Sequence, residues 1–256
     1  MNNKSFDDKR IAKGYAKDRP WLHRLVMERL KSDCAIDTPF HNGLDVGCGA
    51  GLSTKALKLI CYKVTGTDIS YEMIKACKAE YDTSEFTFYT AKAEETPLPE
   101  TPYDIVTAAG VINWVDKDKF LENMNHVMAA NSLLVIYDFW ISDKMVDNDA
   151  YTEWYQKLYL PNFPKPPRNE EVWHQEDLPE GFVIKQQVLY QLYHQFDMDS
   201  FIRFMMIQSN VNSQIQSGRK TVAEIQNWMK ETLEPIFRGL NQNLIFDAYS
   251  WYIERR

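Results

Sequence analysis

The sequence has no surplus of basic residues. It contains 29 Lys and Arg against 36 Asp and Glu, which gives a net charge of −7. A broad nucleic-acid-binding face needs clustered Lys and Arg side chains that neutralise phosphates. The composition therefore argues against such a face, and we expect no nucleic-acid partner, although a local basic patch is compatible with these totals.

The sequence also lacks long apolar runs, paired cysteines and metal-binding patterns. No stretch of about 18 apolar residues could cross a membrane, and the polar, charged start is unlike a secretory signal peptide. The four cysteines form no C-x-x-C pair and indicate reduced thiols, which are typical of a cytoplasmic protein. No H-x-x-x-H or clustered acid pattern points to a metal. We therefore expect a cytoplasmic protein with no membrane partner and no bound metal.

The sequence does contain a regular alternation of short apolar strands with helices. At 256 residues the chain fits one large domain. Strands and helices that alternate at this spacing predict an α/β fold with a doubly wound, mostly parallel sheet. The expected strands are residues 43–46, 63–67, 86–90, 104–108, 132–140, 181–190 and 244–253. The expected helices are residues 21–32, 52–60, 70–80, 117–129, 197–216 and 221–240.

A glycine turn stands between the first strand and the helix that follows it. The stretch reads Leu44-Asp45-Val46-Gly47-Cys48-Gly49-Ala50-Gly51. Glycines at alternate positions let the backbone turn tightly and touch a ligand, and the free N–H groups of the next helix point at the turn. The next strand ends in Asp68, 17 residues after Gly51 (68 − 51 = 17), where a carboxylate can accept hydrogen bonds from ribose hydroxyls. The pattern predicts a nucleoside site.

The spacing of the glycines narrows the choice of nucleoside. A dinucleotide fingerprint, G-x-G-x-x-G, would need a glycine where Leu52 stands, and Gly51 completes G-x-G-x-G instead. A chance glycine turn in another α/β protein is the alternative, but the acid at the end of the next strand favours a nucleoside site. Here the sequence resembles the class I S-adenosylmethionine (SAM)-dependent methyltransferases, of the methyltransferase type 11-like group. The Y-x-x-x-R-P pattern at residues 15–20 is similar to that of relatives of the trans-aconitate type.

The resemblance covers essentially the whole chain and is strongest over residues 43–140. It implies a Rossmann-like methyltransferase fold with a seven-stranded sheet, whose last strand lies antiparallel between the fifth and the sixth. It also implies SAM as the cofactor and S-adenosyl-L-homocysteine as the product. The cofactor-binding residues that it implies are Asp45, Gly47, Gly49, Gly51, Asp68, Ile69, Ala93, Glu94, Val111 and Tyr15.

The expected role of each follows from its place in the family's motifs. Asp45 is expected under the glycine turn near the amino end of the cofactor, and Asp68 at the ribose hydroxyls. Ile69 is expected to cover the adenine, whose edge meets Ala93 and Glu94, and Val111 to lie near the sulfur. Tyr15 belongs to an N-terminal segment that folds over the site in relatives. Family members commonly have an acid where this chain has Lys92, which cannot accept a hydrogen bond from the adenine amino group.

We expect a single methyltransferase domain over residues 1–256. Its core comprises residues 33–140, 181–190 and 242–256, and its cap comprises residues 1–32, 141–180 and 191–241. The cap is rich in aromatic residues, and an apolar pocket with a few polar groups suits a small organic molecule. The candidate pocket residues are Arg19, Asn113, Trp114, Trp154, Tyr155, Arg203 and Phe204. The two arginines could bind a carboxylate or could be ordinary surface charges.

Methyl transfer is an in-line displacement in which the protein mainly aligns the reactants and excludes water. Asn113 and Trp114 stand where relatives often have His-Trp, so no general base is evident. No catalytic residue is assigned, and His174 and His194 are the candidates that could reach the cap. We expect a methyltransferase that acts on a small organic acceptor at oxygen, either a carboxylate or a hydroxyl. Methylation of tRNA or protein, and non-catalytic SAM binding, are the alternatives.

Overall fold

The computed structural model describes residues 18–81, 84–165 and 172–256, which fall into two compact units. The sheet unit comprises residues 21–81, 84–139, 172–190 and 248–256 of the described chain. The helical unit comprises residues 18–20, 140–165 and 191–247. The three longest strands contribute residues to both units, and each unit is described below by itself.

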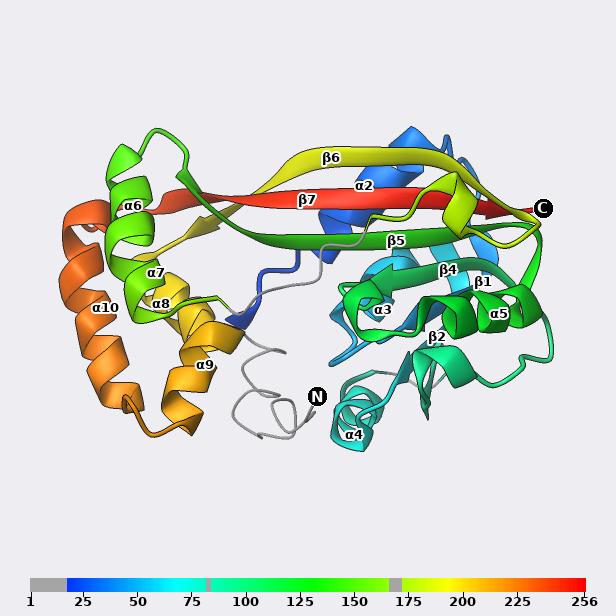
Figure 1. Ribbon diagram of the computed structural model, residues 1–256, viewed down its shortest axis with the longest axis horizontal. Coiled ribbons are helices and arrows are strands. Elements are labelled where there is room, and N and C mark those ends of the chain that lie inside the picture. The colour runs from blue at the N-terminus through cyan, green and yellow to red at the C-terminus, as the bar shows by residue number, and fades with distance from the viewer. Residues whose placement is uncertain (1–17, 82–83, 166–171) are drawn as a thin grey trace. The chain divides into compact units, whose positions relative to one another are not determined.

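Within the described residues, seven strands form one sheet in the order β3-β2-β1-β4-β5-β7-β6. The strands are β1 (Phe40–Val46), β2 (Cys61–Asp68), β3 (Phe86–Thr90), β4 (Tyr103–Ala109), β5 (Met128–Met145), β6 (Phe182–Phe196) and β7 (Gln242–Arg255). The pairs β1–β2, β1–β4, β2–β3 and β4–β5 are parallel, whereas β7 runs opposite to β5 and β6 (Figure 1). The expected α/β fold and the place of the last strand are confirmed.

The sheet unit carries helices on both faces, with α5 on one and α2 and α3 on the other (Figure 1). Its helices are α2 (His23–Asp33), α3 (Leu52–Leu57), α4 (Tyr71–Glu80) and α5 (Lys117–Val127), with 3-10 turns η2 (Lys58–Ile60), η3 (Ala93–Glu95), η4 (Ile112–Trp114) and η6 (Gln175–Asp177). The Ser70 side chain accepts a hydrogen bond from the Met73 N–H and caps α4, as the sequence predicts. The Asp116 carboxylate caps α5 in the same way.

The core of the sheet unit is continuous across the strands and α5. Successive residues of β1, β4 and β5 are buried, as expected for strands covered on both faces. The buried members of this core on β1, β4, β5 and α5 are Leu44, Val46, Tyr103, Val106, Ala108, Met128, Leu134, Ile136, Phe120, Leu121, Met124 and Val127. This packing holds the carboxyl ends of the parallel strands in place.

Helix α2 groups with the sheet unit, and the expected cap role of residues 1–32 stays a prediction. The Trp21 indole donates a hydrogen bond to the Leu52 carbonyl at 3.0 Å, and His23 Nδ1 lies 2.9 Å from the Tyr137 hydroxyl. Val26 and Leu30 are buried on the inner face of the helix. Residues 172–180 also group with the sheet unit, and residues 242–247 group with the helical unit. The amphipathic pattern of α2 predicted a helix but not the surface that it covers.

The helical unit contains α6 (Asp149–Trp154), a π-helix η5 (Tyr155–Tyr159), α7 (Leu160–Asn162), α8 (Met198–Met206), α9 (Ser209–Gln216) and α10 (Val222–Phe237). Residues 197–216 were expected as one helix, but the chain breaks between α8 and α9. There Gln208 takes an extended conformation, with φ −66° and ψ 140°. Thr221 and Glu224 form the predicted capping box at the start of α10.

Candidate cofactor site

The parallel strands of the sheet unit end at one common edge. Val46 of β1 pairs with Thr67 of β2 and with Ala108 of β4. Gly47, which follows β1, and Asp68, the last residue of β2, are therefore neighbours. Ligands of open α/β sheets collect at this edge.

The glycine turn after β1 is held by close packing. Gly47 and Gly51 have φ values of +66° and +86°, in the region that favours glycine. A Cβ on Gly47 would lie 2.3 Å from Val111 Cγ2, and a Cβ on Gly51 would lie 2.5 Å from Tyr81 Cε2. These two glycines are thus required because neighbouring side chains occupy the space that a methyl group would need.

Gly49 differs from the other two glycines of the turn. Its φ is +51°, and a Cβ built on it would meet no atom within 4 Å. This side of the turn is open, so the Gly49 backbone can approach a ligand.

The Asp68 carboxylate is fixed beside this open side by two backbone groups. The Gly49 N–H donates to Asp68 Oδ2 at 2.9 Å, and the Ser70 N–H donates to Asp68 Oδ1 at 2.8 Å. Burial raises the pKa of Asp68, while the two N–H groups oppose that shift. An ionised carboxylate offers about four acceptor positions, so each oxygen can accept a further hydrogen bond. The arrangement suits two adjacent hydroxyl donors.

Asp45 lies fully buried beneath the turn. The Ser53 and Thr54 hydroxyls donate to its Oδ2 at 2.6 and 2.7 Å, and the Thr107 hydroxyl donates to its Oδ1 at 2.9 Å. Burial raises the pKa of Asp45 to about 6, against the lowering effect of these hydroxyls. Asp45 therefore ties β1, the start of α3 and β4 together. The buried carboxylate thus supports the turn, and its expected place near the amino end of the cofactor stays a prediction.

The comparisons with known proteins agree with this geometry. A family model described as a methyltransferase domain matches residues 44–136. The ubiquinone/menaquinone biosynthesis C-methyltransferase UbiE of Psychromonas ingrahamii is 29% identical over 126 residues, which are 46% of this chain and 50% of that protein. The ubiquinone biosynthesis O-methyltransferase of Bradyrhizobium diazoefficiens is 35% identical over 95 residues, which are 36% of this chain and 38% of that protein.

Over residues 44–136 the chain is similar to the class I SAM-dependent methyltransferases. It spans about half the length of the curated relatives that it matches. A protein from Anaeromyxobacter dehalogenans that is proposed to be a type II methyltransferase shares the fold, with a TM-score of 0.71 at 18% identity. That match covers 91% of this chain and 95% of the other.

The cofactor of this family is SAM, and the residues present fit it. The open side of Gly49 leaves room for a ligand, and Asp68 presents two oriented oxygens beside it. The chain thus keeps the two features from which the sequence predicted a nucleoside site.

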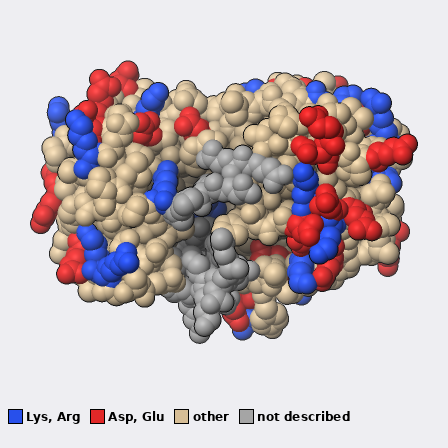
Figure 2. Space-filling view, viewed as in Figure 1, with Lys and Arg blue, Asp and Glu red and all other residues tan. Residues whose placement is uncertain are grey.

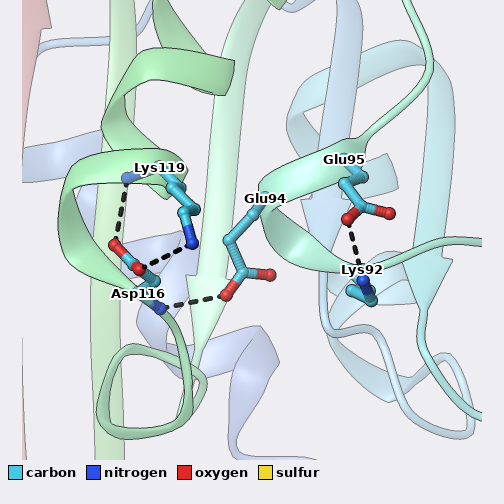
Figure 3. A network of polar contacts seen from close by, with 5 residues as sticks. All are labelled: Lys92, Glu94, Glu95, Asp116 and Lys119. Carbon is cyan, nitrogen blue, oxygen red and sulfur yellow. Dashed lines mark hydrogen bonds and ion pairs between the residues drawn. The ribbon is translucent and has the colours of Figure 1, made fainter.

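Of the residues expected at the adenine, Ile69 is exposed, whereas the Glu94 side chain already has a hydrogen-bond partner within the chain. Ile69 directly follows Asp68 and its side chain is 55% exposed, so it can cover a base. Glu94 Oε1 accepts a hydrogen bond from the Asp116 N–H at 2.9 Å (Figure 3). Lys92 is paired with Glu95 at 2.8 Å and is not an adenine acceptor. Glu94 therefore orients the start of α5, while Ala93 lies half-buried in the preceding turn.

The loop after β4 carries the groups expected at the reacting end. Val111 packs against Gly47, as the contact distance above shows. Asn113 is exposed, and the Trp114 side chain is 67% exposed. The Trp114 N–H donates to the Val111 carbonyl at 2.9 Å and closes the turn. Trp114 is therefore available on the surface of the sheet unit and is not a core residue.

Asp138 of β5 is a carboxylate at this edge that sequence reasoning missed. Its Oδ1 would lie 3.2 Å from a Cβ on Gly110, and it accepts a hydrogen bond from the Phe139 N–H at 2.8 Å. The Gly110 N–H donates to the Tyr137 carbonyl at 2.8 Å, which holds the two segments together. The available signal was an acid that interrupts the apolar run of residues 132–140.

The remaining aromatic pocket candidates are core residues of the helical unit. Trp154, Tyr155 and Phe204 are each at most 4% exposed. The Trp154 indole donates to the Thr232 hydroxyl at 2.9 Å, and the Phe204 ring stacks on Phe196 at 5.3 Å. These three side chains pack against other rings, and their role as walls of an acceptor pocket stays a prediction.

The structure describes the two candidate arginines but not Tyr15. Arg203 Nε lies 3.3 Å from Asp18 Oδ1, so its partner is a carboxylate of the chain itself. Arg19 is half-buried in the helical unit. Tyr15 lies outside the described residues.

The two histidine candidates sit in ordinary structural positions. His174 caps the 3-10 turn η6, and its N–H donates to Asp177 Oδ2 at 2.8 Å. The His194 ring packs edge-on against Phe196 at 4.6 Å, and burial lowers the pKa of His194. A catalytic role for either residue stays a prediction.

Two searches covered only the described residues. No group of three or more His, Cys, Asp or Glu side chains in that part of the chain could hold a metal ion. No helix there is both long and apolar enough to cross a membrane.

Proposed function

We propose that this methyltransferase moves a methyl group from SAM to a small organic acceptor, at an oxygen atom. The observation that carries the proposal is the Asp68 carboxylate, which the Gly49 and Ser70 N–H groups hold beside the open side of the turn. A half-buried carboxylate with both oxygens oriented and acceptor positions to spare suits a ribose diol.

The binding roles that we propose follow the positions of the groups. Asp68 accepts hydrogen bonds from the ribose hydroxyls, and the backbone of residues 47–51 contacts the methionine portion. Ile69 covers the adenine, and the backbone of Ala93 meets its edge. Val111 borders the sulfur, and Asp45 holds the turn.

The bound cofactor supplies a methyl group on a positively charged sulfur. The chain then has to orient the acceptor in line and exclude water. A carboxylate acceptor needs no base at neutral pH, whereas a hydroxyl has to lose a proton. Asp138, beside Gly110, is the carboxylate that we propose receives that proton. Its position supports a hydroxyl acceptor over a carboxylate, which the Asp138 charge would repel.

Transfer to carbon is a second candidate, favoured by one observation. The similar proteins include the UbiE C-methyltransferases as well as an O-methyltransferase of ubiquinone biosynthesis. The names of these relatives make a phenol-like ring a reasonable acceptor to test, because such a ring offers both an oxygen and a carbon nucleophile. Methylation of tRNA has less support, since acidic and basic side chains are interspersed on the face shown in Figure 2.

We also propose that the chain acts as a single methyltransferase domain. The helical unit contains Arg19 and Arg203, the candidates for acceptor contact. The Arg203–Asp18 pair supports a positioning role for Arg203, because its guanidinium already has an acidic partner.

Titration calorimetry with SAM tests the proposed cofactor site. Asp68→Asn should weaken binding by at least about tenfold, since hydrogen bonds to charged groups contribute about 1.5–3 kcal/mol each. Asp118→Asn, at an exposed position on α5, is the matched control and should bind as the parent does. No heat with SAM, or unchanged affinity in Asp68→Asn, would refute the proposed site.

Transfer of labelled methyl groups tests the proposed acceptor. The panel of acceptors comprises phenols, aliphatic hydroxy acids, carboxylic acids, tRNA and proteins. Asp138→Asn should lower kcat for hydroxyl acceptors and leave SAM affinity unchanged. Product analysis separates O-methyl from C-methyl products. SAM binding without transfer to any acceptor class would favour the non-catalytic alternative.

A further inference from the structure

Helix α4 begins shortly after Asp68, and its buried face reaches the glycine turn. The buried residues of this helix are Met73, Ile74 and Cys77. The Cys77 sulfur would lie 3.2 Å from a Cβ on Gly51. One helix of the sheet unit therefore borders both strand ends that form the candidate cofactor site.

The Cys77 thiol also has a polar partner in the turn. Cys77 is fully buried, and its S–H donates to the Gly49 carbonyl oxygen, with an S···O distance of 3.2 Å. The Cys48 thiol donates to the same oxygen over a longer distance, 3.8 Å. A thiol is a weak donor, but a hydrogen bond inside a protein is electrostatically stronger than the same bond in water. Cys77 is therefore the closer hydrogen-bond partner of this carbonyl.

The backbone of Gly49 is thus held on both sides. Its carbonyl accepts from Cys77, and its N–H donates to Asp68 Oδ2 at 2.9 Å. The other oxygen of Asp68 accepts from the N–H of Ser70, the N-cap of α4, at 2.8 Å. Helix α4 therefore contacts Asp68 through its N-cap and Gly49 through Cys77, which closes a ring of hydrogen bonds around the open side of the turn.

We infer that Cys77 is a positioning residue of the cofactor site and orients the Gly49 backbone against the Asp68 carboxylate. The inference rests on the proposed SAM site, because these two groups bind the cofactor there. Side chains pack against Gly47 and Gly51, whereas a Cβ on Gly49 would meet no atom within 4 Å. The hydrogen bond on the Gly49 carbonyl supplies the restraint that packing supplies at the other two glycines.

This restraint should act on cofactor affinity. A backbone that is oriented before the ligand arrives loses less conformational entropy on binding. Without the thiol, the Gly49 peptide would turn more freely, and Asp68 Oδ2 would lose part of its orientation. Replacing Cys77 should therefore weaken binding, although no group that touches the cofactor is removed.

Calorimetric titration with S-adenosyl-L-homocysteine measures this effect. Cys77→Ala should weaken binding by about three- to tenfold, the range expected for the loss of one neutral hydrogen bond. Cys77→Ser keeps a donor and should recover most of the affinity. Ile74→Val, at a buried position on the same helix, is the matched control for lost packing and should bind as the parent does. Urea denaturation shows that each variant is folded.

Amide hydrogen exchange by NMR tests the orientation of the turn without any ligand. In Cys77→Ala the Gly49 N–H should exchange about three- to tenfold faster than in the parent, because its bond to Asp68 opens more often. Cys77→Ser and Ile74→Val should exchange at that position as the parent does. The amides of β4 report global unfolding and serve as the reference.

Two results would overturn the inference and leave the proposed cofactor site intact. One is an unchanged affinity in Cys77→Ala while the parent binds the ligand. The other is an equal loss in Cys77→Ala and Cys77→Ser, which would assign the effect to packing. If the parent itself fails to bind, the proposed cofactor site fails, and the exchange rate of the Gly49 amide still decides whether Cys77 orients the turn.

Discussion

At the scale of single residues, glycine serves two purposes in the turn after β1. Gly47 is required because Val111 fills the space beside it, whereas Gly49 faces open space. The G-x-G-x-G pattern predicted a ligand-binding turn but could not separate these purposes. The difference depends on side chains from the loop after β4, far away in the sequence.

Alanine at the two positions should therefore have different effects. Gly47→Ala should lower the free energy of unfolding by about 2–4 kcal/mol, because a methyl group would overlap Val111 and the backbone has a positive φ. Gly49→Ala should cost about 1 kcal/mol in stability from its positive φ, and should weaken SAM binding. Urea denaturation and calorimetry measure the two effects. Equal loss of stability in both variants would contradict the distinction.

Asp45 should make stability depend on pH. Burial holds its pKa near 6 in the folded chain, above the ordinary value of 3.8, so between these values the folded state binds the proton more readily than the unfolded state. The contribution of this group is therefore greatest at low pH and is lost as the pH rises through about 6. Other carboxylates titrate in the same range, so a variant without this group is needed for comparison.

Asp45→Asn is the variant that isolates the effect. The difference in unfolding free energy, parent minus Asp45→Asn, should fall by about 2 kcal/mol between pH 4.5 and pH 7. Denaturation at the two pH values measures it. A difference that stays constant, or that rises with pH, would show that Asp45 is not held in its neutral form by burial.

At the scale of elements, the strands and their order were predictable, while several boundaries were not. Short apolar segments between turn residues located the seven strands, and Ser70 marked the start of α4. The break at Gln208 had no glycine or proline to announce it. It follows from packing, because both α8 and α9 bury side chains within the helical unit.

The candidate site was predictable to a similar extent. Asp68 and the glycines lie at one strand edge because the parallel strands end in register. The three hydroxyls on Asp45 and the approach of Asp138 to Gly110 depend on tertiary contacts. The ring contacts of Trp154 and Tyr155 within the helical unit also depend on tertiary neighbours, because an aromatic residue in the sequence suits a pocket wall and a core equally.

The capping box of α10 provides a test of element stability. The Thr221 hydroxyl accepts a hydrogen bond from the Glu224 N–H, and Glu224 accepts one from the Thr221 N–H. Thr221→Ala should lower the unfolding free energy by about 1 kcal/mol. Adding Glu224→Ala should cost less than in the parent, because the box is already broken. Additive losses would show that the two residues act separately.

At the scale of the whole molecule, the cofactor site and the aromatic core belong to different compact units. The glycine turn, Asp68 and Asp138 belong to the sheet unit, and the Trp154 cluster belongs to the helical unit. Ligand binding stabilises the folded state that binds it, by about 2.7 kcal/mol at a ligand concentration of 100 times Kd. Its local effect should be greatest where the backbone touches the ligand.

Hydrogen exchange with S-adenosyl-L-homocysteine can therefore locate the site without knowledge of the acceptor. Saturating ligand should slow exchange over residues 47–54 and 66–75, because the turn after β1 and the Asp68 segment become ordered around the adenosyl group. The interior of α10 has no proposed contact with the ligand and should change much less. Slower exchange in α10 with no change in the glycine turn would place the ligand elsewhere. A uniform slowing over both units would instead indicate that binding acts only through global stability.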